Sequence, residues 1–139
     1  MTTRLSIVNQ IEEDLKKIKI SRGYKHEPVE IKRGLYRWVD FPTKPALCFS
    51  LYMDEDDVDS LSGDLARWLK LYFYGFIETD GLGDTTRVQE FEEDVENFLN
   101  STDNTYKLNT LIGNVEIKEG GVNDPINSFI IEASIMYET

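Results

Sequence analysis

Residues 27–53 constrain the fold most, because they have the pattern of two strands joined by a rigid, bent connection. Within a first strand predicted at residues 24–32, apolar residues alternate with charged ones, which is typical of a strand with one buried face. Pro42 and Pro45 interrupt regular strand pairing and predict a crossover before an apolar run at residues 46–53. The other helices and strands are expected to pack on the sheet that these two strands begin.

The apolar run at residues 46–53 predicts a strand whose side chains alternate between two faces. One face is expected to hold Leu47, Phe49, Leu51 and Met53, and the other Cys48, Ser50 and Tyr52. Because Cys48 is the only cysteine and lies inside this strand, we expect a small buried core residue. An acidic loop is predicted to follow at residues 54–59.

Two segments have the spacing of amphipathic helices. Thr2 or Thr3 can cap the first helix, and Gly23 is expected to end it. Its predicted buried stripe comprises Leu5, Val8, Ile11, Leu15 and Ile18. Thr86 and Gln89 predict a capping box for the second helix. This helix is expected to bury Val88, Phe91, Val95, Phe98 and Leu99, and to expose an acidic outer face of Glu90, Glu92, Glu93, Asp94 and Glu96.

Three further strands complete the predicted sheet. Aromatic residues at 65–78 favour a strand that is covered on both sides, because both alternating faces are apolar. Residues 111–118 and 129–137 alternate in the same way and predict an antiparallel pair joined by a turn at residues 119–125. The whole chain, residues 1–139, is therefore predicted to be a single α+β domain with a mostly antiparallel or mixed sheet of four to five strands, flanked by two helices.

Composition argues against several classes of function. The formal net charge is −11, whereas sequence-independent binding to nucleic acid needs basic residues that neutralise phosphates. The chain has no apolar run of 18 residues and no secretory leader pattern, so we expect neither a membrane span nor export by a signal peptide.

No constellation of residues predicts catalysis, a cofactor or a metal. His26 has no second ligand nearby and is expected to have a surface or structural role. The acidic run at residues 54–59 lacks the glycine and glutamate of an EF-hand, so it is expected to be solvated or to order against a basic partner. Gly81 and Gly83 precede a threonine where a dinucleotide-binding loop needs a third glycine. We therefore predict a non-enzymatic protein with no cofactor.

Several short segments follow one another in a distinctive order along nearly the full chain. They are Gly23-Tyr24, residues 29–34, Phe41-Pro42, Pro45-Ala46-Leu47, residues 90–95, residues 129–131 and residues 135–138. In this order the chain resembles the tail terminator (tail completion) proteins of tailed bacteriophages. None of the segments is a catalytic signature, and the resemblance rests on their order.

The resemblance implies a structural subunit with helices packed on a mostly antiparallel sheet. Six copies would form a ring at the head-proximal end of the tail, end polymerisation of the tail tube and present the head-tail joining surface. The implied partners are further copies of the chain, the major tail tube protein and the head-tail connector, while DNA passes through without specific binding. The implied location is the virion tail, and the host cytoplasm during assembly, with no membrane partner. The alternatives are another neck or head-completion subunit, a tail tube subunit, a small non-enzymatic protein-binding module or, least favoured, an enzyme.

A ring with head-to-tail contacts needs two different, complementary patches. We expect an acidic patch of one subunit to face a basic patch around Arg33 and Arg37 of the next. The acidic patch comprises Asp54, Glu55, Asp56, Asp57 and Asp59. Opposite charge is the basis of this hypothesis.

Overall fold

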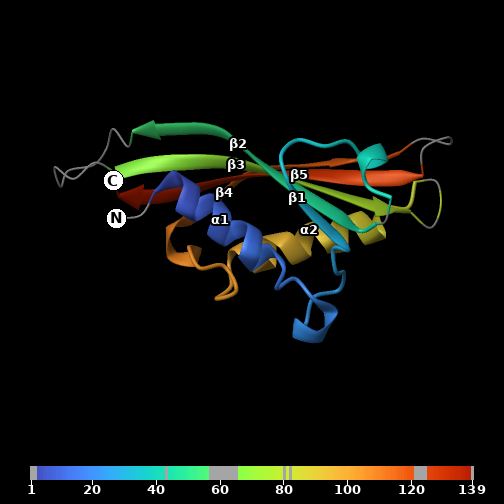
Figure 1. Ribbon diagram of the computed structural model, residues 1–139. Coiled ribbons are helices and arrows are strands. Elements are labelled where there is room, and N and C mark those ends of the chain that lie inside the picture. Colours follow the sequence, from blue (N-terminus) through green and yellow to red (C-terminus); the bar gives the residue numbers. More distant parts are fainter. Residues whose placement is uncertain are drawn as a thin grey trace.

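The computed structural model describes residues 3–42, 44–56, 66–79, 81, 83–120 and 125–138. In this part of the chain, two helices lie on one face of a five-stranded sheet, as Figure 1 shows. The elements are α1 (Arg4–Leu15), β1 (Glu30–Arg33), β2 (Ala46–Asp56), β3 (Ala66–Glu78), α2 (Thr86–Leu99), β4 (Thr110–Lys118) and β5 (Ile126–Glu138). Short 3-10 helices are η1 (Ile20–Arg22), η2 (Trp38–Asp40) and η3 (Lys107–Asn109). The predicted α+β class is confirmed.

The strands lie in the order β1-β2-β3-β5-β4. β1 runs parallel to β2, as the predicted crossover between them requires, and the other neighbours are antiparallel. The predicted antiparallel pairing of the last two strands is confirmed. Irregularities in register occur in β2 between Leu51 and Met53, and in β4 between Ile112 and Val115. Each bulge adds one residue to the strand, so the side chains that follow it point to the opposite face from the one that strict alternation predicts.

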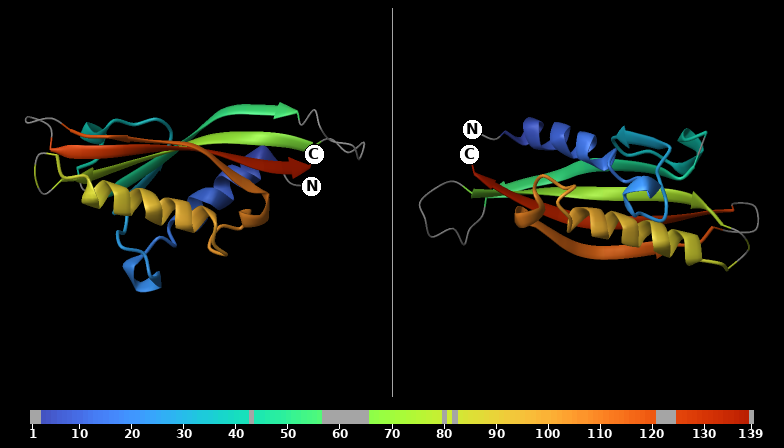
Figure 2. Two further views of the ribbon diagram at one scale, coloured as in Figure 1. Left: turned by 180° about the vertical axis from the view of Figure 1, so that it is seen from behind. Right: turned by 90° about the horizontal axis from the view of Figure 1, so that it is seen from below.

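The main core lies between the sheet and the two helices (Figure 2). Alternate residues of β3 and β5 are fully buried there, as the period of a strand demands. Gly75 of β3 lies under the ring of Phe129, and a Cβ atom at this position would be 2.1 Å from the ring carbon Cε1 of Phe129. Glycine is therefore required for the close approach of β3 and β5 at this point.

On the opposite face of the sheet, the described residues form a cluster of buried side chains at one end. There Phe41, from the segment that contains η2, packs with Cys48 and Phe76, so the predicted burial of Cys48 is confirmed. Tyr74 packs partly against this cluster, and farther along β3 Trp68, Lys70 and Tyr72 are only half-buried. The prediction that β3 is covered on both sides is therefore wrong along much of its length. We call the part of this sheet face that carries Tyr52, Met53, Trp68, Lys70 and Tyr72 the open face.

The first strand is shorter than predicted. Instead of residues 24–32, β1 comprises four residues, Glu30–Arg33. The backbone N–H groups of Lys25 and His26 donate to the Asp94 carboxylate of α2, at 3.0 and 2.7 Å. Because the N–H groups of residues 25 and 26 are bound to a helix, they are not available for pairing with a strand.

β2 is longer than predicted and extends to Asp56. Asp54 and Glu55 therefore lie in a strand and not in a loop, while Asp57 and Asp59 lie outside the described residues. The bulge after Leu51 places Met53 opposite Lys70, which lies between buried Leu69 and Leu71 in β3. Met53 is thus on the open face, and its predicted place beside Leu51 is wrong.

α1 begins as predicted but ends earlier. Thr3 caps it, with the Thr3 side chain accepting from the Ser6 N–H at 3.1 Å. The helix ends at Leu15, and Gly23, with φ of 96°, instead ends η1. The predicted stripe is confirmed except for Leu5, which is 64% exposed. Ile7, which is outside the predicted stripe, is fully buried.

α2 buries its predicted apolar stripe, but its cap and outer face differ from the prediction. Thr85 is the N-cap, so the predicted capping box of Thr86 and Gln89 is wrong. The Thr86 N–H donates to the Asp84 carboxylate at 2.9 Å, and the Gln89 amide donates to the Thr85 hydroxyl at 2.7 Å. The predicted solvated face is wrong at two positions, since Glu92 and Asp94 are buried.

Candidate subunit interface

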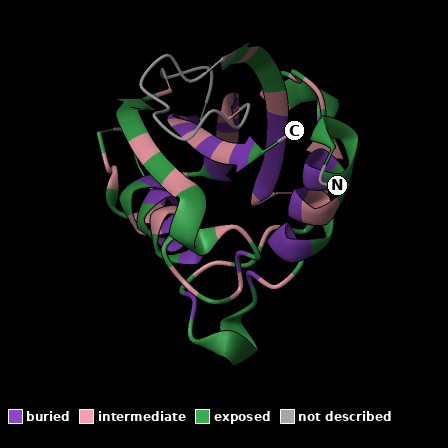
Figure 3. Cartoon of the chain, turned by 90° about the vertical axis from the view of Figure 1, so that its left-hand side faces the viewer, coloured by how far each residue is buried: buried purple, intermediate pink, exposed green. Residues whose placement is uncertain are grey.

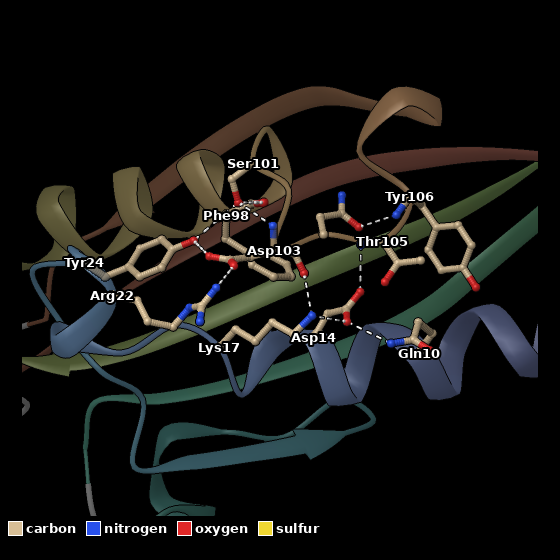
Figure 4. Close-up of polar contacts among 11 residues, drawn as sticks. Gln10, Asp14, Lys17, Arg22, Tyr24, Phe98, Ser101, Asp103, Thr105 and Tyr106 are labelled. Atoms are coloured by element: carbon tan, nitrogen blue, oxygen red, sulfur yellow. Dashed lines mark hydrogen bonds and ion pairs between the residues drawn. The ribbon is translucent and has the colours of Figure 1, made fainter.

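One set of polar side chains joins α1 to the segment after α2 (Figure 4). The buried Asp14 carboxylate accepts from the Thr105 N–H at 2.8 Å, from Gln10 at 2.8 Å and from Lys17 at 3.2 Å. Burial raises the pKa of Asp14, but these hydrogen bonds outweigh that effect and hold it below its ordinary value. Asp14 is therefore an internal anchor that holds the fold together.

A second anchor fixes the turn after η1. The hydroxyl of Tyr24 donates to the Asp103 carboxylate at 2.7 Å, and Arg22 forms an ion pair with the same carboxylate. Burial raises the pKa of Asp103, and the bonds from Arg22 and Tyr24 lower it by more, so the net pKa is below normal. His26 lies in the same region. Its Nε2 atom is 3.3 Å from Oε1 of Glu90, and its ring lies edge-on to Phe91, in agreement with the surface or structural role predicted for it.

Glu92 of α2 is the most perturbed acid of the described residues. Its burial, followed by its contact with Glu96, raises its pKa to about 8. One of its carboxyl oxygens, Oε1, is buried without a hydrogen-bond partner. A protonated Glu92 avoids placing two negative charges side by side in the core. Glu92 lies on the face of α2 that also buries Val88 and Val95.

Asp54, the first residue of the predicted acidic patch, is bound within its own subunit. Its side chain is 8% exposed and contacts Arg4 and Arg67, each at 3.1 Å, and the Tyr137 hydroxyl at 2.7 Å. Burial raises the pKa of Asp54, but the bonds from Tyr137 and the two arginines lower it below its ordinary value. Asp54 therefore joins α1, β3 and β5, and a role in a contact between subunits stays a prediction.

The other residues of the predicted interface are dispersed. Arg33 ends β1 and reaches α1, where it donates to Asn9 at 2.7 Å and pairs with Glu12. Arg37 is exposed, and its backbone N–H donates to Asp40 at 2.9 Å. Glu55 pairs with Lys70 at 2.7 Å on the open face. Asp56 is the last residue of β2, and Asp57 and Asp59 lie outside the described residues.

A groove opens between the N-terminal half of α1 and β2. Its volume is about 340 Å³, and it is lined by Arg4, Leu5, Val8, Arg33, Gly34, Phe49, Ser50 and Leu51. It begins where β1 ends, because Gly34 turns the chain away from the sheet with φ of 120°. The Gly34 N–H makes a last bond to the Phe49 carbonyl at 2.7 Å. Past Phe49, no strand of the described residues pairs with β2 on this side.

Aromatic residues gather on the open face. The rings of Tyr52 and Tyr72 stack with centroids 4.0 Å apart, and Tyr74 follows at 5.9 Å from Tyr72. Trp68, farther along β3, lines a shallow groove of about 220 Å³ whose wall on β4 is Leu111. Such exposed apolar surface is typical of a contact site for another protein.

β4 is the other edge strand of the sheet, with no neighbour beyond it among the described strands. In Figure 3 the edge strand on the side away from α1 is drawn mostly in green and pink, the colours of exposed and intermediate residues. Leu111 is 61% exposed, and Val115 and Ile117 are each 40% exposed. Exposed edge strands with apolar side chains pair readily with other strands.

The sequence prediction identified Arg33 at the rim of the groove but not the groove itself. Leu5 was predicted to lie in the buried stripe of α1, and Leu51 on the same strand face as Leu47 and Phe49, yet both are exposed in the groove. The open face could have been predicted from the sequence. Trp68, Tyr72 and Tyr74 recur at even positions of β3, and they alternate with the buried residues Leu69, Leu71 and Phe73.

A comparison with models of known protein families gives no match for this chain, and a comparison with curated proteins gives none either. The described residues contain no group of three or more histidine, cysteine, aspartate or glutamate side chains placed to hold a metal ion. None of the described helices is long and apolar enough to cross a membrane.

Proposed function

We propose that this chain is a structural subunit of the bacteriophage tail, which forms a ring at the head-proximal end and ends polymerisation of the tail tube. The observation that carries the proposal is the surface that the described residues of the sheet expose: an aromatic open face, the β2 edge past Phe49 and the outer edge of β4. A ring subunit needs surfaces for its two neighbours and for the tube. The polar side chains that are buried, such as Asp14 and Asp94, serve to hold the fold.

The resemblance to tail terminator proteins adds the partners to this proposal. The order of helices and strands that it implies agrees with the fold, in which both helices lie on one face of a mostly antiparallel sheet. The partners would be the major tail tube protein on one side of the ring and the head-tail connector on the other. The net charge of −11 suits a ring through which DNA passes without being held.

The experiment adds the purified protein to polymerising tail tube subunits from the same source and measures tube lengths by negative-stain microscopy. The expected result is short tubes with extra density at one end. Unchanged tube lengths without density at either end would refute the proposal and favour a connector subunit or a separate binding module.

A further inference from the structure

We propose that β4 of a second copy of this chain pairs with the free edge of β2, in the groove beneath α1. The inference deepens the proposed ring-forming function, on which its biological role rests. Among the described residues, two surfaces of one molecule fit each other: the part of β2 past Phe49 has no neighbouring strand on one side, and β4 has none on its outer side.

The groove lies beside β2, where a further strand of the sheet would lie if β1 were longer. β1 pairs with β2 only as far as Phe49, and the chain leaves the sheet at Gly34. Among the described residues, residues 50–53 therefore form an edge of the sheet, and α1 lines the groove beside it. An incoming strand can continue the line of β1 and bond to this edge through its main chain.

Apolar side chains line the groove. Leu51 lies opposite buried Leu71, so it points to the helix face, yet it is 39% exposed. Leu5 of α1 is 64% exposed and lines the same groove. A strand that enters here must therefore bring apolar side chains on its helix face.

β4 carries such side chains. Val115 lies opposite Ile131, and Ile117 opposite Phe129, and both of these partners are buried on the helix face. Val115 and Ile117 therefore point to that face, although each is 40% exposed. If the sheet continues from one copy into the next, Val115 and Ile117 of one copy lie in the groove of the other, on the same face of the sheet as Leu51.

Charge fits the same arrangement. Copies with a net charge of −11 repel one another, so their contact favours a site where acidic and basic groups meet. The groove has Arg4 and Arg33 on its walls, and within the subunit these also pair with Asp54 and Glu12. Glu119 follows Val115 and Ile117 at the next alternate position, and it is exposed. With β4 antiparallel to β2, Glu119 comes to the Arg33 end of the groove.

The direction of pairing follows from the sheet itself. β2 and β3, β3 and β5, and β5 and β4 are each antiparallel, so β4 runs opposite to β2 in one subunit. If rotation about a ring axis carries one sheet into the next, β4 meets the following β2 in antiparallel orientation. The contact joins two different patches, and such a contact forms a ring when the rotation between copies closes.

Disulfide trapping tests this contact even if free copies associate weakly. Leu51→Cys protein is mixed with Val115→Cys or Ile117→Cys protein under mild oxidation, and the products are separated on a non-reducing gel. Cys48 is buried in the native chain, so wild type serves as the blank. Leu108→Cys, at a position that is 94% exposed, measures random collision. Circular dichroism confirms that each variant is folded.

The expected result is a cross-linked dimer in the mixtures, several-fold above both the Leu108→Cys level and each variant alone. Cross-links formed mainly between two Ile117→Cys chains would show a two-fold contact of β4 with β4 and overturn the proposal. Mixtures at the level of random collision would overturn it as well. If the dimer is cross-linked but the protein does not change tube length, the contact is retained and the proposed function is refuted. If tubes are capped but no dimer is cross-linked, the proposed function is retained and the contact is refuted.

Discussion

Replacing Glu92 with glutamine tests the buried acid of α2. The folded pKa is about 8 and the ordinary value is 4.5. Between these values the folded chain holds a proton that the unfolded chain has lost, so stability falls as pH rises through this window. Each pKa unit corresponds to about 1.4 kcal/mol, so at pH 7 the cost of protonating Glu92 on folding is about 3 kcal/mol.

The assay is urea unfolding at pH 5, 7 and 8. Glu92→Gln is expected to exceed the wild type by about 1 kcal/mol at pH 5 and by about 3 kcal/mol at pH 7. Glu93→Gln is the matched control, because Glu93 is exposed on the same helix and adds only a small repulsion. If Glu92→Gln and wild type lose stability in parallel from pH 5 to pH 8, then Glu92 is charged in the folded state and the reasoning is wrong.

Two further substitutions test the anchors of the fold by the same unfolding measurement. Asp14→Ala leaves the Thr105 N–H without its acceptor and is expected to cost about 3 kcal/mol at pH 7, whereas Glu13→Gln, at an exposed ion pair, costs about 0.5 kcal/mol or less. Because its folded pKa is lowered, the stabilisation by Asp14 is present above pH 3.8 and is lost as pH falls through the folded value, so equal acid sensitivity of Asp14→Ala and wild type would contradict its role. Gly75→Ala is expected to cost about 1–3 kcal/mol, since its Cβ atom meets the Phe129 ring, while Gly81→Ala meets nothing within 4 Å and is near neutral. Equal stability of the two alanine variants would show that the core adapts without strain.

Periodicity in the sequence was sufficient to predict the buried residues of a helix or strand that packs through one apolar face. The apolar stripe of α2 and the alternation of β5 both follow directly from spacing, and both are confirmed. Periodicity does not give the width of the buried arc, so it could not show that Glu92 and Asp94 are also inside. The partners of Asp94 are backbone groups of residues 25 and 26, far away in the chain, and no local pattern reveals them.

The candidate interface was less predictable because it depends on where elements end. The opposite charges of residues 33 and 54 suggested a contact between subunits, yet Asp54 is bound internally by Arg4, Arg67 and Tyr137. The groove exists because β1 stops at Arg33 while β2 continues to Asp56. A difference in length between neighbouring strands is a tertiary property, which hydrophobic alternation in either strand alone does not contain.

The rotational symmetry of the density at the tube end tests the central claim most directly. Averaged end-on images of capped tubes are expected to show a closed ring of six copies. A Leu51→Asp variant places a charge at the free edge of β2 and is expected to leave the tube ends bare. Wild-type ends without a closed ring, or rings that form equally well with Leu51→Asp, would contradict a head-to-tail ring built through the groove beneath α1.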